Sequence, residues 1–199
     1  MTEPNPDHRF VVVRDEGPGL ERLVRPVVAI GNFDGVHRGH RAVIGTAMER
    51  AQAAHRPAAV LTFEPHPRTF FKPSEPVFRL TPPPLKARLL KALGASFLVV
   101  LAFDREFSSL EPEQFAMRHI VERIAASHVV TGYDFHFGKG RKGNPQTMRE
   151  LGAKLGFSVA IVPKANAPKK GAKDNTDFEG LTIHPVERIE EAMNIVRGL

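Results

Sequence analysis

The sequence contains no cysteine. Disulfides, thiolate zinc sites and cysteine nucleophiles are therefore excluded, and the composition fits a reducing cytoplasm, where we expect the protein to act. It also lacks any apolar run close to the roughly 20 residues that cross a bilayer. The polar N-terminus, residues 1–8, has no apolar segment of the kind found in secretory signals. We therefore expect no membrane association.

Acidic residues are scarce in one stretch of a basic chain, whose net charge is +6. Between Lys139 and Lys173, nine basic residues are opposed only by Glu150. Such a surface attracts nucleic acid or small phosphorylated substrates, although a solvated basic face is the plainer interpretation of charge alone. No nucleic-acid-binding motif accompanies it, so we do not expect nucleic acid as a partner. The sequence does not indicate an oligomeric state.

The 199 residues suit a single domain in which short β-branched runs alternate with helical patterns. Strands are predicted at residues 10–14, 27–31, 58–63, 96–101, 128–131 and 158–162. Helices are predicted at residues 39–54, 82–94, 108–124, 144–156 and 185–197. This alternation predicts an α/β fold: a Rossmann-like, doubly wound parallel sheet of about five to six strands with helices on both faces. Ligands of such sheets bind beyond the carboxyl ends of the strands.

Several helix ends carry recognisable signals. Thr81 and Asn144 are expected as N-caps because a proline follows each of them, and Gly156 is expected to end a helix. A capping box is expected to begin a helix at Ser108. Residues 64–80 form a proline-rich connection.

The segment Ala-Ile-Gly-Asn-Phe-Asp-Gly-Val-His-Arg-Gly-His, residues 29–40, joins a predicted strand to a predicted helix. Its glycines let the backbone turn tightly and approach a ligand closely. His37 and His40 are spaced so that both imidazoles can point to one place beside the unpaired N–H groups of a helix start. This pattern favours a polyphosphate site, while metal binding and helix capping remain open on spacing alone. It is not a Walker loop, since no Gly-Lys-Ser/Thr follows.

Two further blocks follow predicted strands. They are Leu61-Thr-Phe-Glu-Pro-His-Pro67 and Val129-Val-Thr-Gly-Tyr-Asp-Phe-His-Phe-Gly-Lys-Gly-Arg-Lys-Gly143. Taken alone, the first indicates a rigid proline turn with His66 exposed. The second indicates a glycine-rich hairpin with Phe135 and Phe137 in the core.

Together the three blocks resemble a known family. Gly-x-Phe-Asp-Gly-x-His-x-Gly-His is similar to the signature of the N-terminal FMN adenylyltransferase module of bacterial bifunctional FAD synthetases (riboflavin kinase/FMN adenylyltransferase). Its His-x-Gly-His core is shared with a wider nucleotidyltransferase superfamily. The other blocks resemble the Thr-Phe-x-Pro-His-Pro and Gly-x-Asp-Phe-x-Phe-Gly-x-x-Arg-x-Gly segments of that family. The resemblance covers residues 10–163 in order.

The resemblance implies transfer of AMP from ATP to FMN, giving FAD and pyrophosphate, with Mg²⁺ held through the phosphates and no protein metal ligand assigned. It implies catalytic roles for His37 and His40. It implies nucleotide contacts by Gly31, Asn32, Phe33, Asp34, Gly35 and Arg188. It implies flavin or acceptor contacts by Phe63, Pro65, His66, Pro67, Asp134, Phe135, Phe137 and Arg141.

The C-terminal segment, residues 164–199, departs from the family. Where the family has Ile-Ser-Ser-Thr-x-Ile-Arg, this chain has Pro185, Val186 and Glu187 at the hydroxyl positions and Glu190 for the last arginine. Carboxylates there would repel a triphosphate. Two alternatives therefore stand beside the enzyme: a degenerate member that binds ATP or flavin without turnover, and a nucleotidyltransferase with another phosphorylated acceptor. The chain stops where the riboflavin kinase domain would begin, so we expect one nucleotidyltransferase-like domain, residues 1–199, without kinase activity.

Overall fold

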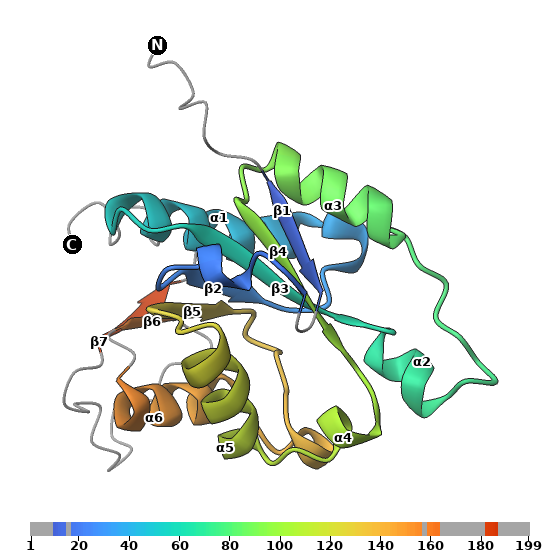
Figure 1. Ribbon diagram of the computed structural model, residues 1–199. Coiled ribbons are helices and arrows are strands. Elements are labelled where there is room, and N and C mark those ends of the chain that lie inside the picture. The colour runs from blue at the N-terminus through green and yellow to red at the C-terminus, as the bar shows by residue number, and fades with distance from the viewer. Residues whose placement is uncertain (1–9, 15–16, 157–158, 164–181, 187–199) are drawn as a thin grey trace.

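The computed structural model describes residues 10–14, 17–156, 159–163 and 182–186 (Figure 1). Its centre is one sheet of seven parallel strands in the order β1-β4-β3-β2-β5-β6-β7. The strands are β1 (Val11–Arg14), β2 (Val27–Ile30), β3 (Ala58–Glu64), β4 (Phe97–Ala102), β5 (His128–Thr131), β6 (Val159–Pro163) and β7 (Thr182–Val186). The predicted parallel α/β fold is thus confirmed, with one strand more than expected.

The additional strand corrects the last predicted helix. Pro185 and Val186, expected to begin that helix, lie in β7, where Pro185 is in register with Val162 of β6. A proline has no N–H for a sheet ladder, and β7 is an edge strand of the kind that tolerates one. The prediction of a helix start at Pro185 is therefore wrong, because a proline also suits an edge strand. Residues 187–197 of the predicted helix lie outside the described residues.

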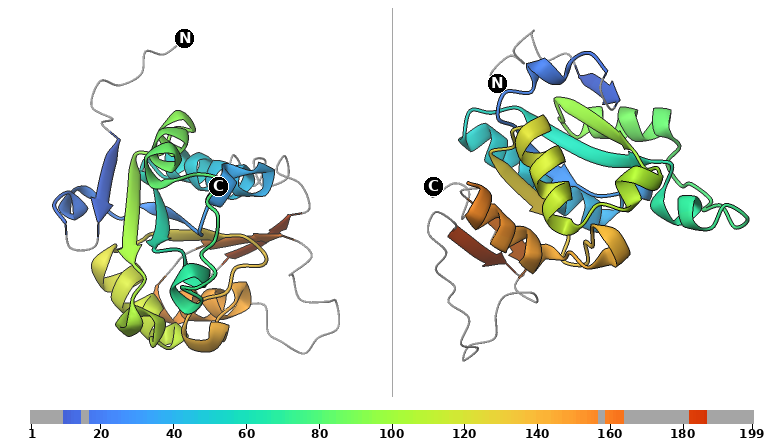
Figure 2. Two further views of the ribbon diagram at one scale, coloured as in Figure 1. Left: turned by 90° about the vertical axis from the view of Figure 1, so that its right-hand side faces the viewer. Right: turned by 60° about the horizontal axis from the view of Figure 1, so that its bottom comes forward.

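Helices cover both faces of the sheet (Figure 1), and Figure 2 shows the same layers from two further sides. On one face lie α1 (Arg38–Ala53) and α3 (Pro83–Ala92). On the other lie α5 (Pro112–Phe115), which continues through a π-helical segment (Ala116–Arg123), and α6 (Pro145–Leu155). Two short helices, α2 (Pro67–Phe71) and α4 (Arg105–Ser108), follow the ends of β3 and β4. The proline-rich connection therefore contains a helix that was not expected.

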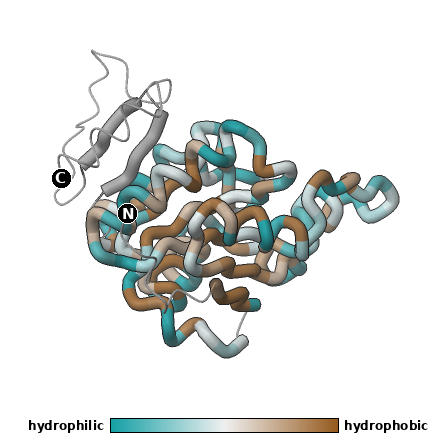
Figure 3. The backbone as a smooth tube through the Cα atoms, turned by 90° about the horizontal axis from the view of Figure 1, so that it is seen from above, coloured by the Kyte–Doolittle hydropathy of each residue, from teal (hydrophilic) through white to brown (hydrophobic). Residues whose placement is uncertain are grey.

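The strand side chains divide into two cores by simple alternation. Along β3, Ala58 and Val60 face α1 and α3, whereas Ala59, Leu61 and Phe63 face the opposite layer. Figure 3 shows hydrophobic positions concentrated along the central strands. The same alternation places the polar residues at the end of β3 on the α3 side, which matters for the site described below.

The helix ends agree with the sequence signals in part. The Asn144 side chain accepts from the Thr147 N–H (2.9 Å), and Gly156 ends α6 with φ +86°. However, the N-cap of α3 is Pro82 rather than Thr81. The expected capping box lies three residues later than Ser108, where the Glu111 N–H donates to the Gln114 side chain (3.0 Å).

Candidate functional site

The loop from β2 to α1, residues 31–37, lies at the carboxyl edge of the sheet. It turns through a short 3₁₀ segment, Asp34–Val36, with left-handed backbone at Phe33 (φ +49°), Gly35 (φ +74°) and Val36 (φ +40°). For non-glycine residues this conformation costs roughly 1–3 kcal/mol each, so it persists only where surrounding contacts enforce it. A β-carbon at Gly31 would come within 3.1 Å of the Phe33 ring, and the turn depends on its absence.

The two histidines of this loop meet, as their spacing predicts. His37 is the N-cap of α1, and its Nδ1 accepts from the His40 backbone N–H (3.3 Å). The two imidazole centroids are 3.6 Å apart and the rings are nearly parallel, at 21°. Beneath them the buried Phe33 ring packs edge-on against His40, with centroids 5.3 Å apart. Because Nδ1 of His37 accepts this hydrogen bond, the N–H of the ring lies on Nε2 and can be donated to a ligand.

His40 is neutral, and one of its ring nitrogens is among two buried polar atoms here that have no hydrogen-bond partner. Burial, and secondarily the neighbouring imidazole of His37, lower the pKa of His40 to about 4, so this ring is neutral at pH 7. His40 Nδ1 is buried without a hydrogen-bond partner, and so is Asn32 Oδ1. Buried polar atoms are nearly always paired in native proteins, so these two positions are candidates for contact with a ligand or an ordered water.

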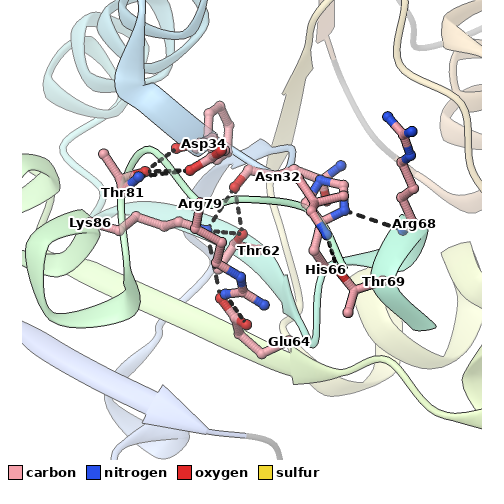
Figure 4. Close-up of polar contacts among 12 residues, drawn as sticks. Asn32, Asp34, Thr62, Glu64, His66, Arg68, Thr69, Arg79, Thr81 and Lys86 are labelled. Atoms are coloured by element: carbon pink, nitrogen blue, oxygen red, sulfur yellow. Dashed lines mark hydrogen bonds and ion pairs between the residues drawn. The ribbon is translucent and has the colours of Figure 1, made fainter. Parts of the chain in front are cut away.

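Asp34, predicted as a nucleotide contact, accepts hydrogen bonds from within the protein. Its carboxylate accepts from the Thr81 N–H (2.8 Å), the Thr81 hydroxyl (2.9 Å) and the Leu80 N–H (3.1 Å) (Figure 4). Thr81 in turn accepts from the Gly35 N–H (2.9 Å). Burial raises the pKa of Asp34, but the hydrogen bonds outweigh it and hold the pKa below its usual value. Asp34 therefore fastens the loop to the segment before α3.

A second network, which the sequence analysis missed, lies at the end of β3. Buried Lys86 of α3 donates to the Asn32 carbonyl (2.8 Å) and approaches the Thr62 hydroxyl (3.4 Å) and the Glu64 carboxylate (3.7 Å). Glu64 also pairs with Arg79 (Figure 4). A signal was present: Lys86 lies four residues before buried Leu90, on the face of α3 that packs inward. A lysine there predicts a buried acceptor.

The second sequence block lies beside this network. A cis bond joins Glu64 to Pro65, and Pro67 opens α2. The Nδ1 of His66 accepts from the Arg68 N–H (3.2 Å), as Figure 4 shows. Burial and the nearby charges of Arg79 and Lys86 lower the pKa of His66. His66 is thus half-buried in a cationic surrounding rather than simply exposed.

The third block forms the glycine-rich hairpin. Phe137 exchanges backbone hydrogen bonds with Gly143 (3.0 and 2.9 Å), and its ring stacks at 5.6 Å on Phe135. Phe137 and Phe63 belong to the core on the face opposite α1, so their predicted flavin contacts stay predictions. The exposed carboxylate of Asp134 lies close enough to His40 to oppose part of the lowering of the His40 pKa. Arg141 is exposed with φ +58°, and Arg188 lies outside the described residues.

The described residues contain no group of three or more histidine, aspartate or glutamate side chains placed to hold a metal ion. Within the same residues, no helix has the length and apolar character of a membrane span.

Comparisons with known proteins agree with this geometry. A family model described as FAD synthetase matches residues 21–174. The bifunctional riboflavin kinase/FMN adenylyltransferase of Bacillus subtilis (strain 168) is 40% identical over 141 residues, which are 70% of this chain and 44% of that protein. The corresponding Escherichia coli (strain K12) protein is 35% identical over 67% of this chain and 42% of its own length. The chain thus spans less than half of these two relatives.

Two further matches are consistent. A FAD synthetase of Listeria monocytogenes is 34% identical over 69% of this chain and 55% of its own length. A crystal structure of a macrolide-efflux protein from Streptococcus pneumoniae shares the fold, with a TM-score of 0.62 at 25% identity over 72% of this chain and 55% of that one. With the family model matching well over half of its residues, this chain belongs to the FAD synthetase family.

Proposed function

We propose that this protein transfers AMP from ATP to FMN. A phosphate oxygen of FMN attacks the α-phosphorus of ATP, the bond from that phosphorus to the bridging oxygen breaks, and pyrophosphate leaves as FAD forms. The observation that supports this most directly is the meeting of His37 and His40 at the start of α1, beside the N–H groups of the helix start. Such chemistry depends on positioning and on donors aimed at growing negative charge.

The residues divide the work by position. His37, with its proton on Nε2, donates to a phosphate oxygen, and the N–H groups at the start of α1 favour the same negative charge. His66, beside Arg79 and Lys86, contributes to the acceptor side. Mg²⁺ would be held by the phosphates and would neutralise part of their charge.

An FAD-formation assay tests the proposal. The protein is incubated with ATP, FMN and Mg²⁺, and FAD and pyrophosphate are measured together. We expect His37→Ala to lower kcat about 10²–10³-fold, as removal of one donor to a developing oxyanion does in other enzymes. His55→Asn is the matched control, because His55 is exposed and follows the far end of the same helix. Equal activity of the two variants would refute the assignment of His37.

A protein that binds nucleotides without turnover is the second candidate. Pro185 and Val186 of β7 stand where the family has hydroxyl residues, and Glu187 and Glu190 follow. Calorimetry that detects ATP or FMN binding while no FAD forms would select this alternative. A panel of other phosphorylated acceptors, assayed by pyrophosphate release, separates a different acceptor from both.

A further inference from the structure

Lys86 is the buried ammonium nearest to the β2–α1 loop among the residues described above. Its side chain is 4% exposed and runs from α3 across to the ends of β2 and β3 (Figure 4). An ammonium has three N–H donors, and three oxygens surround this one: the Asn32 carbonyl, the Thr62 hydroxyl and a Glu64 carboxylate oxygen. Burying such a charge is unfavourable unless all of its donors find partners. Lys86 is therefore held by partners inside the protein.

The three contacts are unequal. The shortest, 2.8 Å, goes to the Asn32 carbonyl, whereas the Glu64 oxygen is 3.7 Å away. Glu64 has a closer cation in Arg79, so its charge is compensated without Lys86. The particular contribution of Lys86 is thus the bond to the loop backbone at Asn32, across 54 positions of sequence. The Thr62 hydroxyl donates to the same carbonyl over a longer distance, 3.1 Å, so Lys86 is the shorter of two restraints on it.

The loop needs such a restraint because of its conformation. Phe33, directly after Asn32, has φ +49°, a conformation that a free chain seldom adopts. The Phe33 ring also packs edge-on against the His40 ring. A shift at Asn32 would therefore move Phe33, and with it the imidazole pair.

We propose that Lys86 is a positioning residue for nucleotidyl transfer. Its bond to the Asn32 carbonyl fixes the position of the β2–α1 loop relative to α3, and so places His37 and His40 against the phosphates. This inference rests on the proposed function. A displacement of about 1 Å at a catalytic group can cost about 10²-fold in rate, which sets the size of effect to look for.

The experiment must separate positioning from simple loss of a buried charge. Lys86→Met removes the bond to Asn32 and leaves Glu64 with Arg79 alone. The double variant Lys86→Met/Glu64→Gln returns the net charge of the group Lys86, Glu64 and Arg79 to the wild-type value, but it does not restore the bond to Asn32. Lys91→Met is the matched control, since Lys91 is exposed on the same helix. Each variant is assayed for FAD formation and for melting temperature.

We expect Lys86→Met to lower kcat about 10²-fold, with the KM for FMN within threefold of the control. The kcat of the double variant should stay low, because the bond to Asn32 is still missing although the net charge is that of the wild type. Parallel recovery of melting temperature and kcat would overturn the proposal, and so would a Lys86→Met kcat within threefold of that of Lys91→Met.

The wild-type protein separates this proposal from the proposed function. Absence of FAD formation by the wild type would refute the proposed function, and ATP affinity measured by calorimetry would then decide the role of Lys86. At least tenfold weaker ATP binding by both Lys86 variants than by Lys91→Met would support positioning of the loop. Equal affinities would overturn it.

Discussion

Replacing Asp34 by asparagine tests whether the β2–α1 loop depends on the segment before α3. The Asp34 carboxylate accepts three hydrogen bonds there, two from Thr81 and one from the Leu80 N–H. Asparagine keeps one acceptor oxygen for Thr81 but turns its NH₂ toward the Leu80 N–H, so two donors face each other. We therefore expect the loop to loosen while the rest of the fold remains.

The magnitude follows from the contacts. A hydrogen bond to a charged group contributes about 1.5–3 kcal/mol, and the variant loses one such bond and weakens the others. Partial exposure of Leu80 lets water replace part of the loss, so we expect a decrease of about 2 kcal/mol in the free energy of unfolding. In a chain of this length that corresponds to a decrease in Tm of about 4–8 °C.

Thermal unfolding of four proteins measures this: wild type, Asp34→Asn, Thr81→Val and the double variant. Because the two side chains share a hydrogen bond of 2.9 Å, their effects should be non-additive by about 1 kcal/mol. Glu75→Gln is the control, since its ion pair with Lys72 is exposed and contributes little. A Tm of Asp34→Asn equal to that of the control, or strict additivity with Thr81→Val, would refute the reasoning.

The effect of pH has a definite sign. The folded pKa of Asp34 lies below that of an unfolded aspartate, about 3.9. The stabilisation by the carboxylate is thus fully present above about pH 4 and is lost as pH falls through the lower folded pKa. The Tm difference between wild type and Asp34→Asn should therefore be constant from pH 7 to pH 5 and should shrink in more acidic solution.

Two further predictions concern His40 and the hairpin. NMR titration should show His40 protonating at about pH 4 in the free protein and at a higher pH with ATP bound, because phosphate charge favours the imidazolium; an unchanged value with saturating ATP would exclude contact with the phosphates. Since an unfolded histidine protonates near pH 6.5, acidification from there toward pH 4 should also favour unfolding. Gly138→Ala should lower stability by about 2 kcal/mol more than Gly140→Ala. Both glycines have positive φ, but a β-carbon at Gly138 would lie 2.8 Å from the Pro112 backbone nitrogen, whereas none of the described atoms lies within 4 Å at Gly140. Equal melting temperatures of the two variants would contradict this.

Local signals in the sequence predicted the parts of the site that depend on neighbours in the chain. The spacing of His37 and His40 across a helix start predicted that both rings can point to one place, and the structure brings their centroids within 3.6 Å. Asn144 and Gly156 marked the ends of α6 for the same reason. Apolar strands between helices predicted the parallel sheet, since both faces of such a sheet are buried.

Long-range contacts could not be predicted in this way. Asp34 reaches Thr81 across 47 positions, and Lys86 reaches Asn32 across 54. Neither pair leaves a periodic pattern, and the choice of partner depends on how α3 packs beside the loop. The strand β7 was missed because Pro185 suits both a helix start and a sheet edge, and only the pairing with β6 distinguishes them.

The two long-range contacts restrain the β2–α1 loop. Both contacts hold the loop from the side of α3. The Asp34 carboxylate of the loop accepts from Thr81, and the Lys86 ammonium of α3 donates to the Asn32 carbonyl of the loop. The polar groups that face α3 are therefore paired, while Asn32 Oδ1 and His40 Nδ1 are not. These two restraints fix the loop before a ligand binds. Donors that are fixed in advance, such as the Nε2–H of His37, need no rearrangement when negative charge develops, and the proposed nucleotidyl transfer would depend on this property.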